Sequence, residues 1–214
     1  MKKILLIAGI ALLSLTVNAQ EKSKGLQGAW FATSQIGYQQ TKSGNHKSTN
    51  LSVLPIVGTF ISPSVAVGAG IGYINIKSEN GTTTAANTGL VVVEPLVRKY
   101  WNVSGSLYFF GQLAAPIING KVKDTDIKVS QYGLAASGGF DYFVTKNFSV
   151  EFSYNLANLS FTKLKNFGGA GVDVETTDFS LAHVASVDSE YNSALGGGMN
   201  NAVTPLSFGF KFVF

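Results

Sequence analysis

The sequence predicts an all-β fold: a closed, antiparallel, up-and-down transmembrane β-barrel with eight expected strands behind an N-terminal signal peptide. Three observations lead to this prediction. The chain ends on a strand with one aromatic face, no second long apolar run follows the N-terminal one, and the connections between strands alternate between short and long. Transmembrane barrels combine such features because each strand meets lipid on one face and the lumen on the other.

The N-terminus has the order of charges and apolar residues that marks a secretory leader. Two lysines precede an apolar run from Ile4 to Leu15, and Val17-Asn-Ala19 then offers small residues where a signal peptidase cleaves. We therefore expect residues 1–19 to be the cleaved signal peptide, residues 20–28 a short periplasmic segment and residues 29–214 the barrel. The chain has no cysteine, so neither a lipidated cysteine nor a disulfide is available.

Composition excludes several other classes. Charged residues make up 13% of the chain, against about 25% in an average soluble domain. A membrane protein built from helices would need a run of about 20 apolar residues, and the mature chain has none. Without Lys2 and Lys3 the formal charge falls from +4 to +2, because 14 basic residues then face 12 acidic ones. This small excess gives no reason to expect a nucleic-acid partner.

Alternation of apolar and polar residues predicts the eight strands in order. In the first, Trp30, Ala32, Ile36 and Tyr38 share one face; in the third, Val65, Val67 and Ala69 oppose small residues. The second and fourth are apolar on both faces, which leaves the facing of the second open. The expected strands are 29–39, 50–60, 65–76, 88–101, 107–118, 131–143, 148–161 and 206–214. Each is near the ~9–11 residues with which a tilted strand crosses a bilayer.

The connections alternate in length, which predicts the topology. After strands two, four and six come tight turns at 61–64, 102–105 and 144–147, rich in Pro, Gly, Asn and Ser. After strands one, three, five and seven we expect longer polar loops at 40–49, 77–87, 119–130 and 162–202. Short turns are typical of the periplasmic side and long loops of the outside. In the last of these loops, 177–187 alternates and could form a further hairpin arm.

Aromatic residues close to the short turns predict an interfacial girdle on the periplasmic side. Its expected members are Phe60, Tyr100, Trp101, Tyr108, Tyr142, Phe143, Phe148 and Phe214. The terminal strand should pair with the first strand to close the barrel, since an open edge in lipid leaves backbone groups unpaired. Phe210, Phe212 and Phe214 would then face lipid, and we expect these three residues to be required for assembly into the membrane.

Several of these stretches resemble the small outer-membrane β-barrel family of Gram-negative bacteria, the opacity-type and porin-like proteins of about eight strands. The resemblance is carried by 54–60, 64–73, 95–100, 107–113, 139–150 and 206–212. It covers nearly all of the mature chain and implies the architecture and an outer-membrane location. It implies little about activity, since proteins of one such fold do different things.

Inward-facing charges are the candidate functional residues. If Val91, Val93, Val97 and Trp101 face lipid, then the fourth strand turns its charges into the lumen, and the same parity applies to charged residues on other strands. The predicted lumen network comprises Glu94, Arg98, Gln112, Asp141, Glu151 and Lys211. It could form a charged constriction that selects solutes or a plug of ion pairs, because an eight-stranded barrel barely holds its own side chains. Lys99 should face outward and reach back to the nearby interface.

No pattern in the sequence indicates catalysis or a cofactor. His46 and His183 lie in expected loops without the close partners that a metal site needs. Asp173, Glu175 and Asp178 could hold a divalent cation weakly, but a solvated acidic face explains them better. The glycine clusters at 168–171 and 196–198 lack the lysine and helix of a phosphate-binding loop. We expect no metal, no cofactor and no enzymatic activity; an enzyme acting on lipid would need a nucleophile and base that are not seen.

The sequence thus predicts a non-enzymatic integral protein of the outer membrane, a scaffold that presents four external loops for surface interaction or envelope integrity. The alternative is a narrow porin-like channel or carrier for small solutes. The expected partners are outer-membrane lipid and the barrel-assembly machinery, with no nucleic acid and an unidentified loop ligand.

Overall fold

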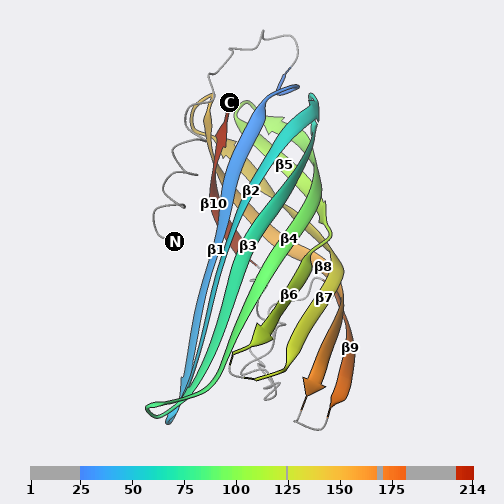
Figure 1. Cartoon of the computed structure of the whole chain (residues 1–214). Helices are drawn as coiled ribbons and strands as arrows, with labels where there is room; N and C mark the ends of the chain where they lie inside the picture. Colours follow the sequence, from blue (N-terminus) through green and yellow to red (C-terminus); the bar gives the residue numbers. More distant parts are fainter. Residues whose placement is uncertain (1–24, 124, 168–170, 182–205) are drawn as a thin grey trace.

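The computed structural model describes residues 25–123, 125–167, 171–181 and 206–214 (Figure 1). The leader and its cleavage site therefore lie outside the described residues. The described chain contains ten strands: β1 (Trp30–Ser43), β2 (His46–Ser62), β3 (Val65–Asn80), β4 (Thr83–Ser104), β5 (Leu107–Ala114), β6 (Ile117–Val122), β7 (Lys128–Phe143), β8 (Phe148–Phe167), β9 (Val172–Leu181) and β10 (Leu206–Val213). Among these residues, no helix has the length and apolar character needed to cross a bilayer.

All strand pairs are antiparallel, and they close into a ring. Sequential neighbours pair from β1 to β4, then through β5 and β6 to β7 and β8, and β10 lies between β8 and β1. The closing pair aligns Phe31 with Val213 and Thr33 with Lys211. Trp30 and Phe214 also exchange backbone hydrogen bonds of 3.1 and 2.8 Å. The predicted closed antiparallel barrel, with the terminal strand joined to the first, is confirmed.

The ring has eight strand positions because β5 and β6 together occupy one of them. Both pair with β4 on one side and β7 on the other, and they are separated only by Ala115 and Pro116. A proline has no N–H to give to the ladder, so the strand is interrupted there. The backbone bridges the break with two hydrogen bonds, Ala115 N–H to Pro95 C=O at 2.9 Å and Gly133 N–H to Pro116 C=O at 3.1 Å.

The three short turns lie at 63–64, 105–106 and 144–147, within or beside the predicted 61–64, 102–105 and 144–147, but three of the expected long loops are largely strand. β1 and β2 run to a two-residue turn at Gly44 and Asn45, and β3 and β4 run to one at Gly81 and Thr82. The first residue of each turn is a glycine with positive φ, 56° and 61°, which a type II′ hairpin turn requires. Only 123–127 separates β6 from β7. These polar segments form strands because pairing with a neighbouring strand satisfies their backbone N–H and C=O groups.

The fourth connection contains a further strand, as its alternation suggested. β9 pairs with the C-terminal part of β8, from Ala157 with Leu181 to Phe167 with Val172, whereas β10 pairs with the N-terminal part of β8. This strand begins five residues before the expected arm at 177–187, and 182–187 lies outside the described residues. Figure 1 shows β9 at the same end of the barrel as the β1–β2 and β3–β4 hairpins, which we call the hairpin end. The opposite end is the tight-turn end.

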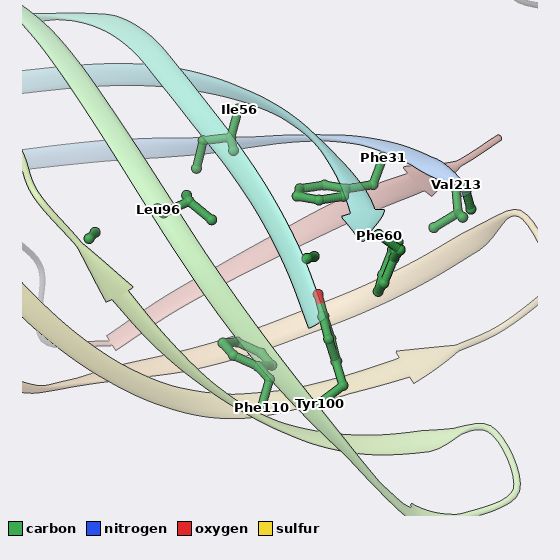
Figure 2. Close-up of a cluster of buried hydrophobic side chains, with 10 residues drawn as sticks. Phe31, Ile56, Phe60, Leu96, Tyr100, Phe110 and Val213 are labelled. Atoms are coloured by element: carbon green, nitrogen blue, oxygen red, sulfur yellow. The ribbon is translucent and has the colours of Figure 1, made fainter. Parts of the chain in front are cut away.

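The barrel has an apolar exterior and a filled interior. Outward faces follow the predicted parity on β1, β3, β4, β8 and β10, and β2 turns Leu54, Ile56 and Phe60 inward. Near the tight-turn end the interior holds an apolar cluster that includes Phe31, Ile56, Phe60, Leu96, Tyr100, Phe110 and Val213, drawn in Figure 2. Leu26 packs against it from the segment before β1. A second cluster toward the hairpin end contains Ile74, Ile76, Leu90, Val92, Ile118, Val129 and Leu164.

Candidate functional site: a buried charge cluster in the barrel lumen

The exterior carries two rows of large, mostly aromatic side chains, one toward each end of the barrel. Toward the tight-turn end, five aromatic residues are aligned across five neighbouring strands: Trp101, Phe109, Phe140, Phe152 and Phe208. The ring of Phe109 lies 5.6 Å from that of Trp101 and 5.5 Å from that of Phe140. Toward the hairpin end, Ile117, Tyr132 and Phe161 form a second row, with the last two rings stacked at 5.3 Å. Such girdles flank the apolar band of a membrane barrel at both interfaces.

The two rows are the right distance apart for a bilayer. Tyr132 and Phe140 are eight residues apart on β7, which corresponds to about 20 Å along the membrane normal at the usual strand tilt. The apolar residues Val91, Val93 and Val97 on β4 lie outward and exposed. A soluble protein would not expose so continuous an apolar surface. The exterior faces lipid, and the protein is an integral membrane barrel of the outer-membrane type.

The prediction of an aromatic girdle near the short turns was wrong in part. Trp101 and Tyr142 are exposed on the exterior as expected, but Phe60 and Tyr100 are buried in the lumen. Tyr108 and Phe143 pack against the same interior cluster. These four residues are aromatic on the inward parity, so position near a turn was a poor guide to facing. Lys99 behaves as expected: it is exposed, and its Nζ donates a hydrogen bond to Ser64 Oγ at the tight turn, 2.6 Å away.

A closed, lipid-facing barrel predicts how the purified protein behaves. We expect the mature protein to require detergent for solubility and to migrate differently on a denaturing gel before and after boiling. The physical reason is that the ring leaves no sheet edge for detergent to open. Recovery of soluble, monodisperse protein without detergent would contradict the assignment.

Arg98 is buried inside the lumen, beside the apolar cluster of the tight-turn end. Its side chain is 1% exposed and projects inward from β4. The guanidinium donates to both carboxylate oxygens of Glu151, at 2.5 and 3.1 Å, and to Gln112 Oε1 at 2.9 and 2.6 Å. It also lies 4.1 Å from the ring centroid of Phe110. The planar guanidinium suits this site because it forms paired hydrogen bonds to a carboxylate and stacks on an aromatic face.

Lys211 is the second buried cation, and it projects into the lumen from β10, the strand that closes the ring against β1. It is fully buried and forms an ion pair with Asp141 of β7. Its Nζ lies 3.8 Å from Glu151 and 3.1 Å from the Tyr100 hydroxyl. That hydroxyl also accepts a hydrogen bond from Arg98, at 3.2 Å. Tyr100 therefore joins the two ion pairs into one network that spans β4, β7, β8 and β10.

The structure places all six residues of the predicted network on the inner face, and five of them are in contact. Glu94 is the exception: it is partly exposed, lies beside the break between β5 and β6, and forms no hydrogen bond or ion pair with another described residue. Sequence reasoning missed Tyr100 and Phe110. Both share the inward parity of Arg98 and Gln112 on their own strands, so alternation alone could have identified them.

The fully buried charges of the network are paired with one another. Both cations have carboxylate partners, and aromatic rings of the interior cluster pack beside them: Lys211 Nζ lies 4.9 Å from the Tyr100 ring and 5.3 Å from the Phe143 ring. The arrangement is a cluster of paired charges and aromatic rings toward the tight-turn end of the lumen. Within the described residues, no group of three or more His, Asp or Glu side chains could hold a metal ion.

Charges on the hairpin end are arranged differently, as partly exposed ion pairs. Lys47 of β2 lies 3.2 Å from Glu79, its directly opposed residue on β3, and Lys77 of β3 also pairs with this carboxylate from two residues earlier in the same strand. Hydrogen bonding to Lys77 and then to Lys47 lowers the pKa of Glu79 below its ordinary value. Because the group is solvated, these pairs contribute little to stability.

Comparison with known proteins adds similarity of fold. No family model and no curated protein sequence matches this chain. Among solved structures, it is similar to the outer membrane protein OprG from Pseudomonas aeruginosa, with a TM-score of 0.48 and 13% identity over 91% of this chain and 99% of that chain. It is also similar to Neisserial surface protein A, with a TM-score of 0.45 and 12% identity over 88% of this chain and 100% of that chain.

Proposed function

We propose that this protein is a non-enzymatic scaffold of the outer membrane, with a closed lumen and with its extended hairpins on the extracellular side. The observation that carries the proposal is the burial of Arg98 and Lys211 among paired carboxylates and aromatic rings inside the barrel. A channel needs water along its lumen, whereas here side chains fill it, as expected for an eight-stranded barrel. The hairpins then carry whatever surface interaction or envelope role the protein has.

The orientation and the partners follow from the same architecture. Tight turns are typical of the periplasmic side, and longer connections of the outside. The lipid-facing belt makes outer-membrane lipid one partner, and insertion of a closed barrel calls for the barrel-assembly machinery as another. Nothing in the exposed charges supports a nucleic-acid partner.

Conductance in planar bilayers tests the closed lumen. We expect the wild-type protein to show little or no steady conductance. Removal of the Arg98 side chain should destabilise the barrel. It should not produce a barrel of unchanged stability that conducts ions selectively. Clear wild-type conductance, with an ion selectivity that Arg98→Ala alters and a stability that it leaves unchanged, would show instead a narrow solute channel.

A further inference from the structure

Three lysines form a cross-strand row on the outer face at the hairpin end of the barrel. Lys121 of β6 is directly opposite Lys128 of β7, and Lys128 is directly opposite Lys165 of β8. All three are exposed, and β6, β7 and β8 lie side by side at this end (Figure 1). We call this set the lysine row. Directly opposed residues of neighbouring strands have Cβ atoms about 5 Å apart, so three positive charges are held close together.

Like charges in this arrangement destabilise a sheet, because directly opposed like charges repel, and no ion pair within the described residues neutralises any of the three. Asp126, in the loop between β6 and β7, is exposed and pairs with none of them. Lys163, two residues before Lys165 on β8, differs because it does form ion pairs: its Nζ lies 3.3 Å from Asp173 and 2.8 Å from Glu175.

The position of the lysine row relative to lipid identifies the kind of partner. Leu107 begins the strand position that β5 and β6 share. Ile117 lies ten residues after Leu107, and Lys121 lies fourteen residues after it. At the usual rise and tilt these positions lie about 25 and about 35 Å from the tight-turn end, respectively. The row Ile117–Tyr132–Phe161 therefore marks the edge of the apolar band, and the lysine row lies one headgroup layer beyond it.

Between these two rows is a polar one. Asn119, Ser130 and Lys163 are aligned across the same three strands, and Ser130 Oγ donates to Asn119 Oδ1 at 3.0 Å. Moving outward along four residues of each strand, the surface thus changes from apolar and aromatic, to polar with one lysine that is paired with Asp173 and Glu175, to the three lysines of the lysine row. An anionic lipid presents the complementary order: acyl chain, ester or sugar, and phosphate.

We propose that the lysine row binds the phosphate groups of an anionic lipid in the leaflet at the hairpin end, with the lipid's acyl chains lying on the Tyr132–Phe161 row. The partner is a lipid and not a soluble anion, because the lysines continue the lipid-facing surface across the interface where headgroup phosphates lie. Basic residues at a membrane surface attract anionic headgroups in this way.

Binding of diphosphorylated lipid A to the full mature chain, folded in a neutral detergent, tests the proposal. Native mass spectrometry would count the bound lipid, and titration would give its affinity. The variant K121Q/K128Q/K165Q should bind about a hundredfold more weakly, at about fivefold per lysine. The corresponding triple Lys→Arg variant should bind within a few-fold of the wild type. Lys42→Gln is the matched control, since it removes one exposed charge from the β1–β2 hairpin, away from the aromatic row, and should change nothing.

A second measurement separates binding from folding. In neutral detergent without lipid, the triple glutamine variant should be at least as heat-stable as the wild type, because the substitutions remove repulsion. Added lipid A should raise the melting temperature of the wild type only. Equal lipid binding by wild type and triple variant, equal loss in Lys42→Gln, or complete competition by millimolar inorganic phosphate would each overturn the proposal, the last by pointing to a free-anion site. None of these results depends on whether the lumen conducts.

Discussion

Replacing Arg98 with alanine is expected to lower the free energy of unfolding by about 3–5 kcal/mol, because it leaves the Glu151 carboxylate buried without its main partner. The loss is large since Arg98 supplies four hydrogen bonds to Glu151 and Gln112, and all three residues are buried. Urea titration of the detergent-folded barrel, followed by tryptophan fluorescence, would measure it.

Two further variants make this prediction specific to the buried network. Lys99→Ala alters the adjacent residue, which faces outward and makes a hydrogen bond to Ser64, so it should cost no more than about 1 kcal/mol. The double variant Arg98→Ala/Glu151→Gln should recover part of the lost stability, because it also removes the stranded negative charge. A small effect of Arg98→Ala together with no recovery in the double variant would mean that water already solvates the lumen.

Substituting aspartate for Phe210 or Phe214 should sharply reduce the amount of protein that reaches the outer membrane. Phe210 is exposed on the exterior, where a carboxylate facing hydrocarbon costs on the order of 2 kcal/mol. Phe214 also closes the ring through its backbone bonds to Trp30. Immunoblots of fractionated membranes would measure the assembled protein, and the heat-dependent gel shift would show whether it is folded.

The controls separate lipid contact from the mere presence of a new charge. Phe210→Leu keeps an apolar side chain and should assemble at normal levels. Thr41→Asp adds the same charge on the exposed part of β1 beyond the membrane and should also assemble normally. Normal levels of both aspartate variants at the terminal strand would show that Phe210 and Phe214 are not required for insertion.

Period-two alternation predicted most of the barrel because the bilayer imposes it. A strand that faces lipid on one side must be apolar there, so the facing of β3, β8 and β10 followed directly from their residues. The lumen network followed from the same rule, since a charge at Arg98 or Lys211 could not face hydrocarbon. The terminal pairing required one further argument, namely that an edge cannot be left open in lipid.

The errors arose where lipid imposes no pattern. Beyond the membrane both faces of a strand meet water, so the polar segments 40–49 and 77–87 looked like loops. Gly44-Asn45 was a usable turn signal, but the strands on either side of it lack apolar alternation. Phe60 and Tyr100 were misplaced for a different reason: their apolar character suits both lipid and a filled lumen, and only their parity distinguishes the two.

The two-residue turns have a thermodynamic consequence for recognition at the hairpin end. β1–β2 and β3–β4 are paired up to Ser43–His46 and Asn80–Thr83, and Gly81 N–H donates to Asn45 C=O at 2.8 Å, which joins the two tips. A long coil would have to lose its backbone freedom when a partner bound, at about 1–2 kcal/mol for each residue ordered. These tips have already lost it during folding, so a partner that recognises them meets a preorganised surface and retains more of its contact energy as affinity.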